Sequence, residues 1–170
     1  MDSFFIFCAQ YLLGFSLIIA AFFTLQQPRE RQVDILIFGL CCASASYLVA
    51  VLASHCYYDP RPFVEGHFKP LIEHDAENGF PSDHTLLLSC IAAVISVFSK
   101  RTGVALWLIA ILVGIARVYV GVHHPLDIIT SICITVLVTQ ALYRTIYNQW
   151  ITQISRKVYL YLFDNKQRWK

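Results

Sequence analysis

Three short segments concentrate polar residues in an otherwise apolar chain. The first is GFPSDHT, which contains Ser82, Asp83 and His84 and leads directly into the apolar run LLLSCIAAVISVF. A helix that begins here would present free N–H groups and the positive end of its dipole, which together bind phosphate. Ser82 could be only an N-cap and Asp83 only a complement to the dipole. His84 has no such role, and a histidine at this point can donate a proton to an oxygen that leaves a phosphate.

The second segment, ARVYVGVHHPLD, contains Arg117, His123 and Asp127. A charge within an apolar helix is expensive, so Arg117 is a functional candidate unless its side chain merely extends to the membrane surface. A carboxylate bonded to one imidazole nitrogen fixes the tautomer and leaves the other nitrogen free as a nucleophile. The spacing of His123 and Asp127 favours such a pair, although Asp127 could be only a first-turn acid behind Pro125 and His123 only a polar interface residue.

The third segment is the loop DPRPFVEGHFKPLIEHDAEN, in which Arg61 precedes Pro62. Proline stiffens the backbone around the arginine, yet Arg61 by itself could be only a solvated loop charge. The three segments together supply two arginines, a helix N-terminus, two histidines and an aspartate. This combination predicts a site that holds, attacks and releases a phosphoryl group.

These segments belong to a chain that is too apolar for an ordinary soluble domain. Its 170 residues are 57% hydrophobic and 14% charged, with a mean hydropathy of +0.58. A transmembrane helix needs about 20 mostly apolar residues. Five runs qualify: 4–25, 33–53, 84–99, 103–122 and 125–147. The third run is short, so we expect it to begin a few residues earlier or to be shielded by its neighbours. The prediction is an all-α integral membrane protein, a bundle of about five transmembrane helices.

The basic residues are unevenly distributed over the predicted connections. Ten of the thirteen lie on the side that holds the C-terminal tail and the connections after the first and third runs: Arg29, Arg31, Lys100, Arg101, Arg144, Arg156, Lys157, Lys166, Arg168 and Lys170. The positive-inside rule makes this side cytoplasmic, so the loop 54–83 is an extracytoplasmic active-site loop. We expect one transmembrane domain, 1–150, followed by a cytoplasmic amphipathic or basic tail, 151–170, on the membrane surface.

The three segments resemble the motifs of the type 2 phosphatidic acid phosphatase superfamily, which read KxxxxxxRP, PSGH and SRxxxxxHxxxD. They occur here as SHCYYDPRP, PSDH and ARVYVGVHHPLD, in the same order, between residues 54 and 127. The resemblance implies that Arg61 and Arg117 bind phosphate oxygens, together with Ser82 and the amides that follow it, including that of Asp83. It also implies that no metal or other cofactor is needed.

The resemblance assigns roles to the remaining site residues as well. His123 would attack phosphorus and form a phosphohistidine, while Asp127 orients the imidazole. His84 would protonate the leaving group and later help water to release phosphate.

The sequence departs from the motifs at three positions. Ser54 replaces the motif lysine, so one phosphate contact is missing or comes from elsewhere, and Lys69 is a candidate substitute. Asp83 stands where the motif has glycine, and Ala116 stands where it has serine. These changes affect substrate preference and rate more than the type of reaction. The family core also commonly has six membrane helices, whereas five are predicted here.

Within the superfamily, the chain looks most like the bacterial undecaprenyl diphosphate phosphatases, because of its small size, its outward-facing site and the form NGFPSDHT. This resemblance implies a multi-pass protein of the bacterial inner membrane with its site facing the periplasm or cell exterior. The expected partners are a polyprenyl diphosphate or another lipid phosphate and the membrane lipids, with no nucleic acid. The oligomeric state is left open, and lipid A, phosphatidylglycerol phosphate and phosphatidic acid are alternative substrates.

Two other classes of function compete with this interpretation. Six histidines lie on the predicted outer side with several acids, but their spacing resembles no standard metal-ligand set, and the cysteines form no zinc-type CxxC pair. A non-enzymatic protein that binds or translocates a phospholipid headgroup would need the arginines. It would not need the pair formed by His123 and Asp127.

Overall fold

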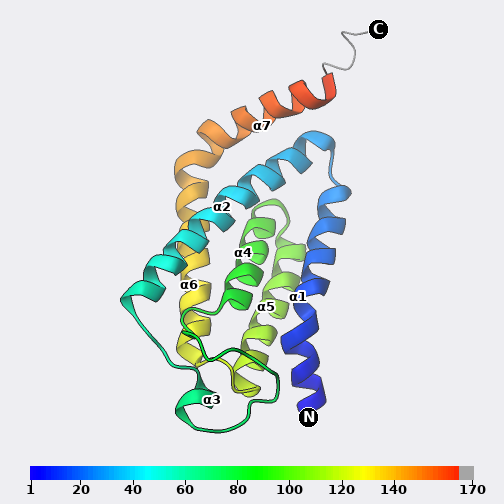
Figure 1. Ribbon diagram of the computed structural model, residues 1–170. Coiled ribbons are helices and arrows are strands. Elements are labelled where there is room, and N and C mark those ends of the chain that lie inside the picture. Colours follow the sequence, from blue (N-terminus) through cyan, green and yellow to red (C-terminus); the bar gives the residue numbers. More distant parts are fainter. Residues whose placement is uncertain (165–170) are drawn as a thin grey trace.

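The computed structural model describes residues 1–164, which fold into a bundle of helices (Figure 1). The elements in chain order are α1 (Asp2–Leu25), α2 (Arg29–Cys56), α3 (Pro62–Glu65), α4 (Asp83–Phe98), α5 (Lys100–Tyr119), α6 (Pro125–Leu142) and α7 (Thr152–Tyr159). Two π-helical segments, Tyr143–Ile151 and Leu160–Asp164, lie before and after α7. The described residues contain one isolated β-bridge, between Pro60 and Asn78.

Four helical stretches are long and apolar enough to cross a membrane, namely α1, α2, α5 and the continuous stretch Pro125–Tyr147. The fifth apolar helix, α4, has 16 residues and is shorter than a usual span. The chain is therefore a multi-pass membrane protein with four to five apolar helices. The all-helical prediction is confirmed. Of the five predicted membrane helices, four are long enough to span the bilayer, and α4, the run expected to be short, is the exception.

The short helix α4 occupies the centre of the bundle, where α5, α6, α2 and α1 all pack against it (Figure 1). More than half of its residues are buried. It begins at Asp83 rather than several residues earlier. Of the two expectations for this run, shielding by its neighbours is thus the one that agrees with the structure.

Two glycines of α5 allow the central helices to approach closely. A Cβ at Gly103 would collide with Ser96 of α4, and a Cβ at Gly114 would lie 2.5 Å from Cγ2 of Ile128 in α6. Small residues at such crossings let helix backbones come together in a membrane. Between α4 and α5, Ser99 Oγ accepts a hydrogen bond from the amide of Thr102 at 3.3 Å and caps α5.

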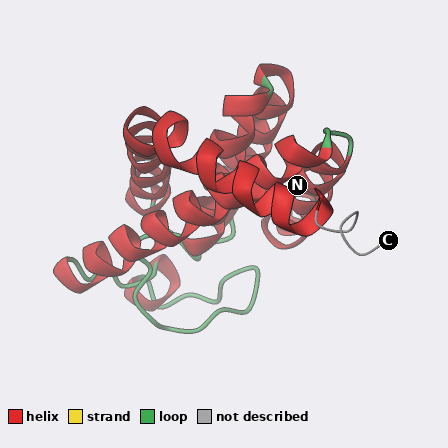
Figure 2. Ribbon diagram, turned by 90° about the horizontal axis from the view of Figure 1, so that it is seen from above, coloured by secondary structure: helices red, strands yellow, loops and turns green. Residues whose placement is uncertain are grey.

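The two ends of the bundle differ in character. The turns that join α1 to α2 and α4 to α5 lie at the same end as α7, which packs against α2 (Figure 1). The long loop between α2 and α4 lies at the opposite end and extends to one side of the helices (Figure 2). Helical structure continues from α6 through the π-helical segment Tyr143–Ile151 into α7. Ile151 and Ser155 are buried, whereas Ile154 is exposed. Residues 165–170 of the expected tail lie outside the described part of the chain.

Candidate active site

The candidate site residues meet at the end of the bundle opposite α7. The loop from α2 to α3 supplies Arg61, and the last turn of α5 supplies Arg117. The N-terminus of α4 supplies Ser82 and His84, and the junction between α5 and α6 supplies His123. Hydrogen bonds between these segments hold the polar groups together below the surface of the bundle.

The side chains of His123 and Asp127 form a buried pair, with exposed fractions of 2% and 0%. His123 Nδ1 lies 3.1 Å from Asp127 Oδ2, which also accepts a hydrogen bond from the amide of His124 at 2.9 Å. A carboxylate can only accept, so Nδ1 carries the hydrogen and Nε2 presents a lone pair. Burial lowers the pKa of His123, and the bond to Asp127 acts in the opposite direction. The free nitrogen is therefore available as a nucleophile near neutral pH.

Both arginines lie beside this free nitrogen. Arg61 Nη1 is 3.4 Å from His123 Nε2 and donates to the carbonyl of Val122 at 2.9 Å, and Arg117 Nη2 is 3.5 Å from the same Nε2. The exposed fractions are 7% for Arg61 and 3% for Arg117. The alternatives of a solvated loop charge at Arg61 and an outward-extending side chain at Arg117 are thus wrong. Across residues 1–164, neither guanidinium forms an ion pair with a carboxylate, so the two charges define an anion site around Nε2.

The N-terminus of α4 faces the same region. Ser82 is fully buried, and its hydroxyl accepts from Thr85 Oγ1 at 3.2 Å rather than from a backbone amide. The alternative in which Ser82 serves only as a side-chain cap of α4 is therefore wrong. Asp83 is exposed and His84 is half-buried. Within the described residues, the amides of Asp83, His84 and Thr85 have no hydrogen-bond acceptor, so the first turn of α4 can bind an anion.

Two polar residues support the site without having been predicted from sequence. Asn78 Oδ1 accepts from the amides of Asp59 and Phe80, and its Nδ2 donates to two carbonyls in the segment that leads to Arg61. Ser131 Oγ donates to the carbonyls of Ser82 and Asp127 at 2.9 and 2.8 Å, which ties α6 to α4. The Asn-Gly dipeptide signals a turn at Asn78. No local pattern marks Ser131, a hydroxyl inside an apolar helix.

Ser54, at the position of the motif lysine, and Lys69, its predicted substitute, both lie outside the hydrogen-bonded groups around His123. Ser54 Oγ donates to the carbonyl of Val51 in its own helix at 2.8 Å. Lys69 is exposed, and its amine forms no hydrogen bond or ion pair with any residue from 1 to 164. It borders a loop cavity of about 330 Å³ that His74 also lines. The imidazole of His74 lies beside the site, with its ring centroid 6.2 Å from that of His123.

The structure also shows the surroundings of the residue at the motif serine position and of the candidate metal ligands. Ala116, at the position of the motif serine, is fully buried in an apolar cluster with Cys8 and Val120. In the described range, no three histidine, cysteine, aspartate or glutamate side chains are arranged to hold a metal ion.

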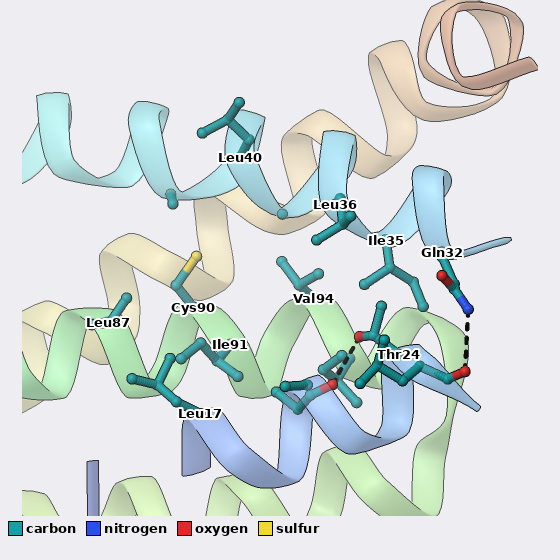
Figure 3. Close-up of a pocket in the computed structure, with 16 residues that line it drawn as sticks. Leu17, Thr24, Gln32, Ile35, Leu36, Leu40, Leu87, Cys90, Ile91 and Val94 are labelled. Carbon is teal, nitrogen blue, oxygen red and sulfur yellow. Dashed lines mark hydrogen bonds between the residues drawn. The ribbon is translucent and has the colours of Figure 1, made fainter. Parts of the chain in front are cut away.

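An apolar groove of about 570 Å³ lies between α1, α2 and α4 (Figure 3). The part contributed by α4 is one face of the helix: Leu87, Cys90, Ile91, Val94 and Ile95. His84 lies three residues before Leu87 and seven before Ile91, so it belongs to the same face. The polar groups of Thr24 and Gln32 at the far end are bonded to backbone carbonyls. The groove thus begins about one helical turn from His84 and runs along α4 toward the α7 end.

The sequence matches one family model and several known proteins. Residues 34–151 match the family model described as the PAP2 superfamily. Undecaprenyl-diphosphatase BcrC of Bacillus subtilis is 30% identical over 141 residues, which cover 81% of this chain and 71% of that protein. Bacitracin transport permease protein BcrC of Bacillus licheniformis is 35% identical over 133 residues, which cover 77% of this chain and 64% of that protein. The chain thus spans less than two thirds of the second relative.

The architecture also matches a solved structure. The crystal structure of Aquifex aeolicus LpxE superimposes with a TM-score of 0.66 over 84% of this chain and 85% of that chain, at 24% sequence identity. A match at this level of identity concerns the fold. The helical bundle described above is therefore shared with that protein.

The close contacts around Gly79 lead to a first prediction. A Cβ at this position would lie 3.2 Å from the carbonyl oxygen of Asp59, 3.3 Å from Asp127 Oδ2 and 3.4 Å from Arg61 Cγ. Gly79→Ala should displace these groups at a cost of about 1 kcal/mol or more. We expect it to weaken the binding of inorganic phosphate by roughly fivefold or more, measured by isothermal titration calorimetry in detergent.

Gly14→Ala is the matched control, because a Cβ at Gly14 meets no atom within 4 Å. It should leave phosphate binding unchanged. Unaltered binding by Gly79→Ala would show that the packing around this glycine does not position the anion site.

Proposed function

The chain belongs to the PAP2 superfamily, and from this premise we propose that it is an integral membrane lipid phosphatase that converts undecaprenyl diphosphate to undecaprenyl phosphate and phosphate. The observation that carries the proposal is the unprotonated Nε2 of His123, which is buried, oriented by Asp127 and flanked by Arg61 and Arg117. A nucleophile between two unpaired cations suits attack on a phosphoryl group.

In the first step, the terminal phosphate binds between the two guanidiniums and the first-turn amides of α4. His123 Nε2 forms a bond to phosphorus while the bond from phosphorus to the bridging oxygen breaks. The negative charge of the bound diphosphate favours the protonated imidazole of His84, which donates its proton to that oxygen, and undecaprenyl phosphate leaves. The Asp127 carboxylate stabilises the positive charge that develops on the imidazole of His123.

In the second step, water attacks the phosphohistidine. Its oxygen bonds to phosphorus as the bond from Nε2 to phosphorus breaks, and its proton passes to the now neutral His84. Inorganic phosphate leaves, and both histidines return to their starting states. The arginines and helix amides supply positive charge in both steps, so the chain's own residues account for the reaction.

The choice of undecaprenyl diphosphate rests on two observations. A Bacillus subtilis relative that carries the name undecaprenyl-diphosphatase is 30% identical over most of this chain. The apolar groove between α1, α2 and α4 begins on the helix face that carries His84 and opens among lipid-facing side chains. Such a groove suits a long hydrocarbon chain whose headgroup lies at His84 and His123.

The distribution of charge supports an outward-facing site. The basic residues Arg29, Arg31, Lys100 and Arg101 belong to the turns at the α7 end, opposite the histidines (Figure 1). The positive-inside rule assigns that end to the cytoplasm. The site would then face the periplasm or cell exterior of a bacterial inner membrane, where it serves the recycling of the cell-wall lipid carrier.

The proposal predicts phosphate release that depends on His123. In detergent with chelator, the protein should release phosphate from undecaprenyl diphosphate, and His123→Ala should reduce the rate by at least about 10³-fold because the nucleophile is lost. His55→Ala is the control, since His55 is exposed and bonded to the carbonyl of Val51. Loss of release in chelator would restore the metal alternative.

If the native protein releases no phosphate from undecaprenyl diphosphate, other lipid phosphates become the candidate substrates. The next substrates are phosphatidylglycerol phosphate, phosphatidic acid and lipid A, each tested under the same conditions. Release from one of these alone would identify a different lipid phosphatase. Silence across the whole panel would favour a protein that binds or translocates phospholipid headgroups.

The buried pair predicts a pH effect of defined sign. Because burial lowers the pKa of His123, the acid-side fall of kcat/KM that comes from its protonation should lie below about pH 6.5, the ordinary histidine value. Asp127 raises this pKa, so Asp127→Asn should move the acid-side fall to still lower pH. The maximal rate should drop by roughly 10²- to 10⁴-fold. A shift to higher pH in the pH profile would contradict the assigned role of the pair.

The groove predicts a dependence on chain length. Gly39 lines the groove, and a Cβ there would meet only Val94 Cγ1, at 3.7 Å. Gly39→Leu should fill the groove and lower kcat/KM for undecaprenyl diphosphate by roughly fivefold, about 1 kcal/mol. The value for farnesyl diphosphate should change little. Gly14→Leu, at an exposed position of α1, is the control, and an equal loss with both substrates would exclude the groove as the chain-binding site.

A further inference from the structure

The site contains one histidine that the proposed reaction does not use. His74 lies in the long loop and is half-buried, and its imidazole packs edge-on to that of His123 at an interplanar angle of 75° and a centroid distance of 6.2 Å. The motif position that would supply a lysine holds Ser54, whose hydroxyl is bonded within its own helix. His74 is therefore a titratable group beside a phosphate site that lacks one expected cation.

The hydrogen bonding of His74 leaves one ring nitrogen available. Its Nδ1 lies 3.3 Å from the carbonyl oxygen of Asp75, which can only accept, so Nδ1 carries a hydrogen. The Nε2 atom forms no hydrogen bond with any described residue. In the protonated imidazole, this nitrogen becomes a donor that can bind a phosphate oxygen.

The charges around His74 favour its neutral form while the site is empty. Burial lowers the pKa of His74, and the positive charges of Arg61 and Arg117 lower it further. His123 acts in the same direction, and the carbonyl of Asp75 acts against it. The side chains of Lys69, Glu73 and Asp75 border the adjoining loop cavity, and the imidazole of His84 on α4 also interacts with that of His74.

We propose that His74 is a phosphate-binding residue that replaces the motif lysine and takes up a proton from solvent when phosphate binds. The inference deepens the proposed function, because it concerns the same phosphate and rests on that proposal. Bound phosphate brings negative charge next to the imidazole and outweighs the two arginines, so the protonated form becomes favoured. Binding and proton uptake are then linked, and affinity for phosphate increases as the pH falls.

A permanent cation at position 54 would bind phosphate without this proton uptake. The backbone at this position is linked to Arg61 through Asn78, because the carbonyl of Ser54 accepts from Asn78 Nδ2 and the carbonyl of Asn78 accepts from Arg61 Nη2 at 3.5 Å. The backbone of a lysine introduced there would be separated from the Arg61 guanidinium by Asn78 and the two hydrogen bonds that it forms. We therefore expect a lysine at position 54 to supply the positive charge that protonated His74 supplies in the native protein.

The test measures the affinity for inorganic phosphate between pH 6 and pH 8, by calorimetry on the full chain in detergent. The variants are His74→Gln, His74→Lys and the double variant His74→Gln/Ser54→Lys, with His55→Gln as the matched control at an exposed histidine. Phosphate itself changes its charge over this pH range, and this affects all variants equally. We therefore divide each affinity by that of His74→Lys at the same pH, and the ratio reports the protonation of residue 74. The melting temperature of each variant reports its folding.

We expect the ratio for the native protein to fall by about tenfold over this pH range, as His74 loses its proton. His74→Gln should bind about tenfold more weakly than the native protein at pH 6 and equally at pH 8. The double variant should recover the affinity of His74→Lys at every pH. His55→Gln should follow the native protein.

Native affinity and native pH dependence in His74→Gln would overturn the inference. Equal weakening of binding at all pH values in both His74→Gln and His74→Lys, without rescue by Ser54→Lys, would also overturn it and would identify a structural role in the loop. These outcomes differ from a failure of the proposed function, which would appear as a native protein that releases no phosphate from any lipid of the panel.

Discussion

The buried carboxylate of Asp127 is the group on which the arrangement of the site depends. Its Oδ2 accepts from His123 and from the amide of His124, and its backbone carbonyl accepts from Ser82 and Ser131. A charged group without such partners would be too costly to bury. One residue therefore fixes the imidazole, the start of α6 and the approach of α4 at the same time.

The charges at this point do not balance within the protein. Two guanidiniums converge on His123 Nε2, while Asp127 is the carboxylate bonded to that imidazole. Burial and the neighbouring Asp127 raise the pKa of Asp59, because a second carboxylate charge is unfavourable at this point. An anion that enters the site compensates the excess of positive charge. The same excess that makes the empty site costly therefore makes phosphate binding favourable.

The parts of the site that are local in sequence were predictable, and those that depend on the path of the loop were not. A helix N-terminus after Ser82 and the spacing from Arg117 to Asp127 follow from residues a few positions apart. The choice between Lys69 and His74 depends on how the loop folds over the bundle, and this in turn depends on Asn78 and on the pairing of Leu71 with Val120. No periodicity records such contacts, because each joins residues that are distant in the chain.

The membrane layout was predictable from hydropathy, except for the role of the shortest helix. Apolar runs identify α1, α2, α5 and α6 because each must satisfy its backbone inside hydrocarbon. The central position of α4 could not be read in the same way, since a helix surrounded by other helices looks like any other apolar run.

The length of α4 determines the depth at which the reaction would occur. Its 16 residues span about 24 Å, whereas the hydrocarbon core is about 30 Å thick. If its far end reaches the opposite membrane boundary, His84 at its start lies several ångströms below the level of the surrounding lipid headgroups. A substrate anchored in the bilayer would then slide its phosphates sideways into a recess without being lifted toward water. Only water and the released phosphate need to cross the gap between the recess and the aqueous phase.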